Sequence, residues 1–161
     1  MDFEKPSTIE HEGKNRERLL SLEKEGKYVF HGSPNIMTVL ESRQAYNRSK
    51  ETGNMEKDGE PAVFATPYVD IAIFRALTDT RGVRGESTSQ FGIDCDKLHF
   101  SATKNILEAA KDKIGKVYVL DKQKFQDFEG MQCRSMETNK PIEAIEVTVD
   151  DLPQNIETIE K

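Results

Sequence analysis

The residues best suited to chemistry lie together in His31-Gly32-Ser33, directly after the apolar residues 28–30. A strand that ends there presents an imidazole and a hydroxyl where glycine lets a ligand approach the backbone closely. A neutral imidazole held by the protein through one nitrogen can donate a hydrogen bond to a ribose hydroxyl through the other. The segment therefore predicts a small polar binding site at the end of a strand.

Arginines supply a second candidate chemistry, because a planar guanidinium binds phosphate through parallel hydrogen bonds. Arg43 is either a solvated surface residue or a phosphate clamp near the mouth of such a site. Three further arginines can serve in the same way, namely Arg75, Arg81 and Arg84. These four are scattered along the chain, so the sequence does not choose between them.

Other familiar constellations are incomplete in this sequence. Asp94-Cys95-Asp96 has no suitably spaced partner for a metal ion, and a solvated turn is the simpler interpretation. Residues 82–85 lack the lysine and hydroxyl ending of a phosphate-binding P-loop. The two cysteines, Cys95 and Cys133, are too few for a disulfide framework. We predict no metal site.

The helices and strands that must position these residues are predicted from the spacing of apolar residues, and their ends from glycine and proline. Helices are predicted over residues 14–25, 69–77 and 102–113, with a turn of helix over 34–40. Strands are predicted over 27–30, 61–65, 117–120, 131–136 and 142–149, within 91–100, and a turn over 122–128. Residues 41–60 and 78–90 are polar and are predicted to be loops, the first of them a lid or recognition element.

Short strands interleaved irregularly with helices favour an α+β fold over a doubly wound parallel sheet, whose strands would be longer apolar runs. The 161 residues suit one domain, which we place at 13–161, after a flexible N-terminal tail over 1–12. The net charge of −6 argues against a general affinity for nucleic acid. No apolar run resembles a membrane span or a signal peptide, so a cytoplasmic protein without a membrane partner is expected.

The order of these motifs carries a resemblance. His31-Gly32-Ser33, a polar stretch, the strand Val63-Phe64-Ala65-Thr66 and then Phe74 resemble the histidine-tyrosine-glutamate branch of the ADP-ribosyltransferase superfamily. That branch includes diphtheria-toxin-like toxins and poly-ADP-ribose polymerases. The resemblance implies a split mixed or antiparallel sheet with flanking helices, and NAD as the substrate bound between them.

The resemblance also implies residue roles around NAD. His31, Gly32 and Ser33 would hold the nicotinamide and its ribose, and Thr66 would close the floor of the pocket. Phe74 would stack on the nicotinamide as the second of two rings. The first ring position holds Val63, for which Phe64 or Tyr68 can partly substitute.

The C-terminal half departs from the pattern of that family at its catalytic position. Residues 116–120 and 132–135 resemble the last strands of bacterial members, in which a glutamate opens a strand and binds the nicotinamide-ribose hydroxyl. The matching position here holds Gln132, and the nearest acid is Glu137. A glutamine can hold a hydroxyl, but it supplies no negative charge to an oxocarbenium-like centre.

Three functions follow from this resemblance. The first is mono-ADP-ribosyl transfer from NAD to an unknown acceptor, which can be a protein, a nucleic acid or a small molecule. Gln132 or Glu137 would then fill the catalytic position. The second is a catalytically inactive module that binds NAD, ADP-ribose or another nucleotide. The third is an RNA 2′-phosphotransferase-like enzyme, which relies on a histidine and arginines such as Arg43. The sequence does not predict the oligomeric state.

Overall fold

The computed structural model describes residues 13–41, 43–48, 51–128 and 131–160, with the backbone alone at 43–48 and 56–61. The predicted tail, residues 1–12, lies outside this part of the chain. The described helices are α2 (Lys14–Lys24), α3 (Val69–Leu77) and α4 (Lys104–Ala110), with 3₁₀ turns η1 (Lys122–Lys124) and η2 (Val149–Asp151). The strands are β1 (Tyr28–Ser33), β2 (Arg43–Arg48), β3 (Met55–Ala65), β4 (Ser89–Asp94), β5 (Lys97–Thr103), β6 (Gly115–Asp121), β7 (Gln126–Phe128), β8 (Gln132–Ser135), β9 (Glu143–Val147) and β10 (Ile156–Ile159).

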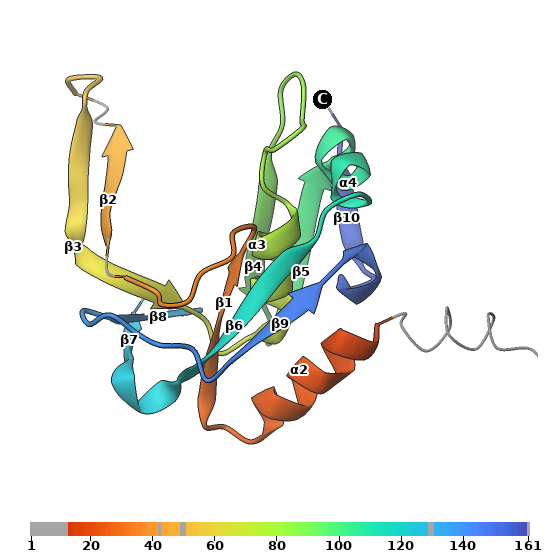
Figure 1. Cartoon of the computed structure of the whole chain (residues 1–161). Coiled ribbons are helices and arrows are strands. Elements are labelled where there is room, and N and C mark those ends of the chain that lie inside the picture. Colours follow the sequence, from red (N-terminus) through yellow and green to blue (C-terminus); the bar gives the residue numbers. More distant parts are fainter. Residues whose placement is uncertain (1–12, 42, 49–50, 129–130, 161) are drawn as a thin grey trace, which may run out of the picture.

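The strands form three small sheets that are mostly antiparallel (Figure 1). One contains β1, β6 and β9, and a second contains β2, β3, β8 and β7. In the third, β5 pairs antiparallel with β4 and parallel with β10. The first two sheets meet where Phe30 and Thr66 exchange backbone hydrogen bonds of 2.8 and 2.9 Å. The predicted α+β class is therefore confirmed.

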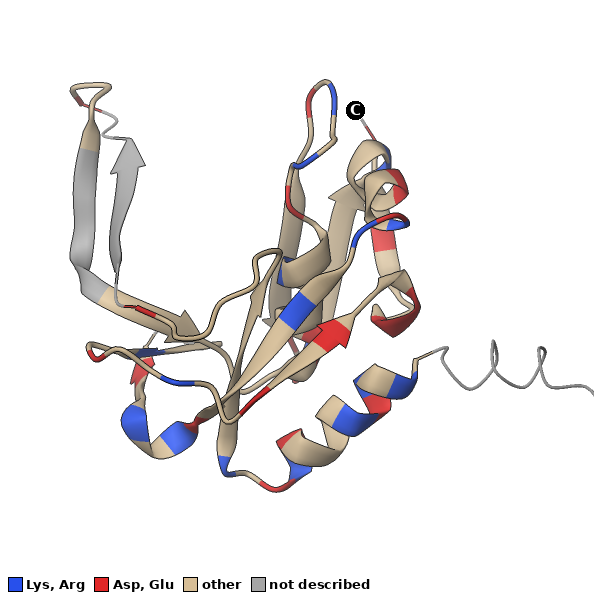
Figure 2. Cartoon of the chain, viewed as in Figure 1, with Lys and Arg blue, Asp and Glu red and all other residues tan. Residues whose placement is uncertain are grey.

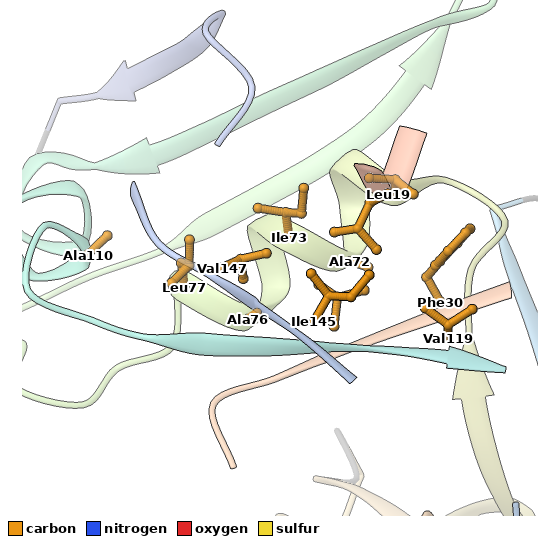
Figure 3. Close-up of a cluster of buried hydrophobic side chains, with 12 residues drawn as sticks. Leu19, Phe30, Ala72, Ile73, Ala76, Leu77, Ala110, Val119, Ile145 and Val147 are labelled. Carbon is orange, nitrogen blue, oxygen red and sulfur yellow. The ribbon is translucent and has the colours of Figure 1, made fainter. Parts of the chain in front are cut away.

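Helix α3 lies in the middle of the molecule because almost all of its side chains are apolar. Only Asp70 and Arg75 of this helix are not buried. One side of α3 meets β6 and β9 in a cluster that includes Ile73, Val119 and Val147 (Figure 3). The other side meets β5 and α4 in a second cluster of buried side chains. A helix that is apolar on most sides must be covered on most sides, and here two sheets cover it.

Two glycines set how closely α3 approaches the β1–β6–β9 sheet. A Cβ on Gly32 would lie 1.8 Å from the backbone oxygen of Ala72, and one on Gly115 would lie 2.8 Å from both the Cβ and the backbone oxygen of Ala76. Ala72 and Ala76 are one helical turn apart, so they meet the sheet from the same side of α3. Gly32 is thus required for helix packing, which is a structural role in addition to its predicted one of admitting a ligand to the backbone.

Helix α2 fixes the start of α3. The side chain of Glu23 accepts a hydrogen bond of 2.8 Å from the backbone N–H of Val69, an N–H that has no partner within its own helix. Arg16 donates two hydrogen bonds of 2.7 and 2.9 Å to Asp70. Figure 2 shows that basic and acidic residues are interspersed along α2. The burial of Glu23 raises the pKa of its carboxyl from the ordinary value.

Several predicted elements agree with the structure. The helices over 14–25 and 69–77 and the strands over 27–30, 61–65, 117–120, 131–136 and 142–149 are confirmed. The shifts at their ends are small, apart from β3, which begins at Met55 and not at residue 61. The strand predicted within 91–100 is a hairpin of β4 and β5. The third helix starts later than predicted, at Lys104, because β5 continues to Thr103. None of the described helices is long and apolar enough to cross a membrane.

Two predictions about irregular segments are wrong, and one strand has no counterpart in the prediction. Residues 41–60 are not a simple loop, because β2 and the first part of β3 pair into a hairpin that extends away from the remaining elements (Figure 1). A hairpin of two strands can form without a buried face, so its sequence need not show the apolar periodicity by which strands are predicted. Residues 34–40 form no helix, and Tyr118 holds them through its hydroxyl, which donates to the Asn35 carbonyl and accepts from the Met37 N–H, both at 2.7 Å. The acidic C-terminal segment contributes β10.

We expect Gly32→Ala to lower the free energy of unfolding by about 1–3 kcal/mol, because the added methyl group must displace the backbone of α3. Urea unfolding followed by circular dichroism measures this change. Gly92→Ala is the matched control, since a Cβ at Gly92 meets no atom within 4 Å. Equal effects of the two substitutions would contradict the proposed packing constraint.

Candidate functional site

A small cavity lies between the end of β1, the end of β3, α3 and the first residue of β8. Its volume is about 30 Å³, enough for about one water molecule. The residues around it that bear on function are His31, Gly32, Phe64, Thr66, Arg75 and Gln132. All six are candidate site residues from the sequence, and the tertiary structure brings them together from four separate segments.

The imidazole of His31 is held in one tautomer by the backbone. Its Nδ1 lies 2.6 Å from the carbonyl oxygen of Phe64, which can only accept, so Nδ1 carries the proton. Burial of the ring lowers the pKa of His31, the Phe64 hydrogen bond opposes this, and the charge of Arg75 lowers the pKa further. A neutral ring protonated on Nδ1 has a lone pair on Nε2. His31 is therefore an acceptor towards a ligand hydroxyl, not the donor that the sequence suggested.

Ser33 and Thr66 serve the local backbone. The Oγ of Ser33 accepts a hydrogen bond of 3.0 Å from the N–H of Asn35, and Ser33 does not line the cavity. The Oγ1 of Thr66 accepts one of 3.1 Å from the N–H of Tyr68, while its backbone pairs with Phe30 at the cavity wall. Thr66 is therefore a wall residue of the cavity, and Ser33 fixes the turn that follows β1.

Aromatic stacking on a nicotinamide is not provided where the sequence placed it. The ring of Phe74 is 1 % exposed and packs against Phe100 and Phe91, at centroid distances of 5.0 and 6.4 Å. It does not line the cavity beside His31. Phe64 lines the cavity, but its ring also contacts that of Phe128 at 5.7 Å and its carbonyl binds His31. The ring of Phe74 is therefore not available to stack on a nicotinamide held by His31, because the protein's own core covers it.

The two candidates for the catalytic position are clearly separated. Gln132 opens β8 opposite Phe128 and lines the cavity beside His31. Glu137 lies beyond the end of β8, is exposed and does not line the cavity. Its backbone N–H donates to the Oγ of Ser135, and its carbonyl accepts from Asn139. Of the pair, Gln132 is the residue placed with His31, and the Glu137 assignment is corrected.

The structure also separates the four candidate arginines. Arg43 pairs with Ala62 through its backbone, and its side chain lies outside what is described. Arg81 is already bound to Asp79 at 2.8 Å, and Arg84 is exposed and away from the cavity. Arg75 lines the cavity. The sequence does not rank these residues, although it offers one signal: of the four, only Arg75 lies in a predicted helix, over 69–77.

The electrostatics of the cavity are those of a binding site without an acid. No Asp or Glu of the described residues lines it. Across the described parts of the chain, no group of His, Cys, Asp and Glu side chains is arranged to hold a metal ion. The polar groups available are the Nε2 of His31, the amide of Gln132 and the cation of Arg75, which suit hydroxyl and phosphate groups.

A larger hollow, about 820 Å³, lies on the other face of β8 and contains none of the predicted site residues. Cys133 contributes to its wall, and successive strand residues such as Gln132 and Cys133 point to opposite faces. Burial, together with the nearby charge of Asp127, raises the pKa of the Cys133 thiol to about 11. The thiol is therefore protonated at neutral pH and is a poor nucleophile.

No family model, curated protein or solved structure matches this chain. The geometry of the cavity and the residues around it are therefore the basis for a functional proposal.

We expect His31 to make folding stability depend on pH. Its pKa in the folded protein is lower than the value of 6.5 for an unperturbed histidine, so the unfolded chain binds the proton more readily. The stability of the wild type should therefore fall as the pH drops below about 6.5. The slope for this one proton is at most about 1.4 kcal/mol per pH unit.

Urea unfolding of the wild type and of His31→Gln between pH 7.5 and 5.5 tests this. The variant should lose less stability than the wild type over that range. Nitrogen NMR of the wild type at pH 7 should show a protonated Nδ1 and an unprotonated Nε2. Parallel stability curves, or a protonated Nε2, would contradict the assignment.

Proposed function

We propose that this chain is a nucleotide-binding module that holds the ribose of an ADP-ribose-type ligand, such as ADP-ribose or NAD, without breaking its glycosidic bond. The observation that carries the proposal is that His31 and Gln132 line one cavity in which no described carboxylate takes part. Both side chains can hold a hydroxyl, and neither can supply negative charge. The scaffold we propose is ADP-ribosyltransferase-like, supported by the order of the His-Gly-Ser strand, β3, α3 and the strand opened by Gln132.

The size of the cavity suggests how the ribose is held. A space of about 30 Å³ admits a hydroxyl group in place of one water molecule, but not a sugar or pyridine ring. The ribose would therefore lie at the mouth and place one hydroxyl inside. That hydroxyl can donate a hydrogen bond to Nε2 of His31. The amide of Gln132 can donate a hydrogen bond to the neighbouring ribose hydroxyl or accept one from it.

The same observations weigh against transfer of ADP-ribose. Cleavage of the bond between nicotinamide and ribose develops positive charge on the sugar, which a nearby carboxylate stabilises. Gln132 is uncharged, Glu137 is elsewhere, and Phe74 is buried. Mono-ADP-ribosyl transfer and 2′-phosphotransfer remain the alternative functions, and each predicts turnover that a binding module does not show.

The first test is binding. We expect ADP-ribose and NAD to raise the melting temperature of the wild type, and His31→Ala to abolish this shift because the acceptor for the ribose hydroxyl is lost. His99→Ala is the matched control, since His99 is exposed on β5 and does not line the cavity. A shift that survives in His31→Ala, or no shift in the wild type, would overturn the proposal.

The same samples report turnover. The wild type should release no nicotinamide from NAD and should leave a 2′-phosphorylated oligonucleotide unchanged when NAD is present. Release of nicotinamide would establish the transferase alternative, and loss of the 2′-phosphate would establish the phosphotransferase alternative.

The second test adds the missing acid. We expect Gln132→Glu to release nicotinamide from NAD at a rate at least about tenfold above the background measured with the wild type, because a carboxylate would then lie beside the bound ribose. Chromatography of nicotinamide measures this, with Glu137→Gln as the control that should change nothing. If Gln132→Glu is inactive while Glu137→Gln alters NAD turnover, position 132 is not the catalytic position.

A further inference from the structure

Arg75 lies between two hollows of the surface. Besides the cavity beside His31, it lines a second hollow of about 340 Å³. The walls of that second hollow come from the end of α3 and from β4, and they include Phe74, Thr78, Asp79, Ser89 and Phe91. One side chain therefore faces both the proposed ribose position and a larger space next to it.

The guanidinium of Arg75 has no anionic partner among the described residues. Three other arginines of the described chain are paired: Arg16 with Asp70, Arg18 with Glu143 and Arg81 with Asp79. Asp79 also lines the second hollow, but Lys113 and Arg81 both bind its carboxylate. Its charge is therefore balanced without Arg75. A cation beside a cavity without a carboxylate favours an anionic ligand.

The ring of Phe91 gives the second hollow an aromatic surface. Phe91 is partly buried, and the guanidinium carbon of Arg75 lies 5.9 Å from its ring centroid. Arg75 is exposed as a residue, but partial desolvation of its guanidinium lowers its pKa from the usual value. An arginine remains charged at neutral pH in any case. A nucleobase can stack on such a ring, and stacking is tolerant of base identity.

We propose that Arg75 binds the diphosphate of a ligand that spans both hollows. This rests on the proposed function: the terminal ribose lies at His31 and Gln132, the diphosphate at Arg75, and the adenosine in the hollow beside Phe91. The volume of about 340 Å³ is within the range of small-molecule sites. The ligand class is thus a dinucleotide or ADP-ribose, and free ribose or a nucleoside is too short to use all three positions.

Isothermal titration calorimetry with ADP-ribose, adenosine and inorganic pyrophosphate tests the assignment on the full chain. We expect Arg75→Gln to weaken ADP-ribose binding by about 10- to 100-fold, to abolish pyrophosphate binding and to leave adenosine binding unchanged. Arg75→Lys should recover part of the ADP-ribose affinity, because it keeps the charge but loses the planar fork. Added salt should weaken ADP-ribose binding less in Arg75→Gln than in the wild type.

The matched control is Arg84→Gln, which removes the same charge from an exposed arginine that lines neither hollow. Equal effects of Arg75→Gln and Arg84→Gln would overturn the assignment. If His31→Ala abolishes ADP-ribose binding while Arg75→Gln does not weaken it, the diphosphate site is wrong and the proposed ribose site stands. If Arg75→Gln abolishes pyrophosphate binding but His31→Ala leaves ADP-ribose binding unchanged, the proposed function is wrong and the anion site stands.

Discussion

The close contact between α3 and the β1–β6–β9 sheet at Gly32 and Gly115 constrains most of this molecule. Because Ala72 and Ala76 touch the backbone of the sheet, the rotation of α3 about its axis is fixed. Arg75, about one turn after Ala72, is then brought to the cavity beside His31. The same rotation turns Phe74 into the core with Phe100. One packing constraint therefore explains both the site that forms and the nicotinamide stacking position that does not.

The chemistry of the site follows from one backbone oxygen. The carbonyl of Phe64 holds the proton of His31 on Nδ1, and burial keeps the ring neutral. The free nitrogen, Nε2, then accepts a hydrogen bond, so its partner in a ligand must be a donor such as a sugar hydroxyl. Because Gln132 stands in place of an acid, the described residues around the cavity can bind a hydroxyl group but include no carboxylate. Resemblance to a family of enzymes gives a scaffold hypothesis, whereas the residues present decide which chemistry it supports.

Much of the fold was predictable where apolar spacing was strong. The helix over 69–77 and the strand over 117–120 are rich in apolar residues because both of their sides are covered, and such patterns survive in the sequence. The β2–β3 hairpin and β10 were missed because their pairing is held by backbone hydrogen bonds, which leave little trace in side-chain type. Residues 34–40 were misjudged because the hydroxyl of Tyr118, from a distant strand, decides their path.

For the site, the sequence by itself determined which groups are present: an imidazole next to glycine, a glutamine where the enzymes that the sequence resembles carry an acid, and four candidate arginines. Only the tertiary structure decided that Gln132 and Arg75 join His31, while Glu137 and Phe74 do not. The reason is physical. Residue type fixes which hydrogen bonds a side chain can make and whether it carries a charge. The position of that side chain in space depends on the rotation of a helix and the register of strands. Contacts between segments far apart in the chain set both of these.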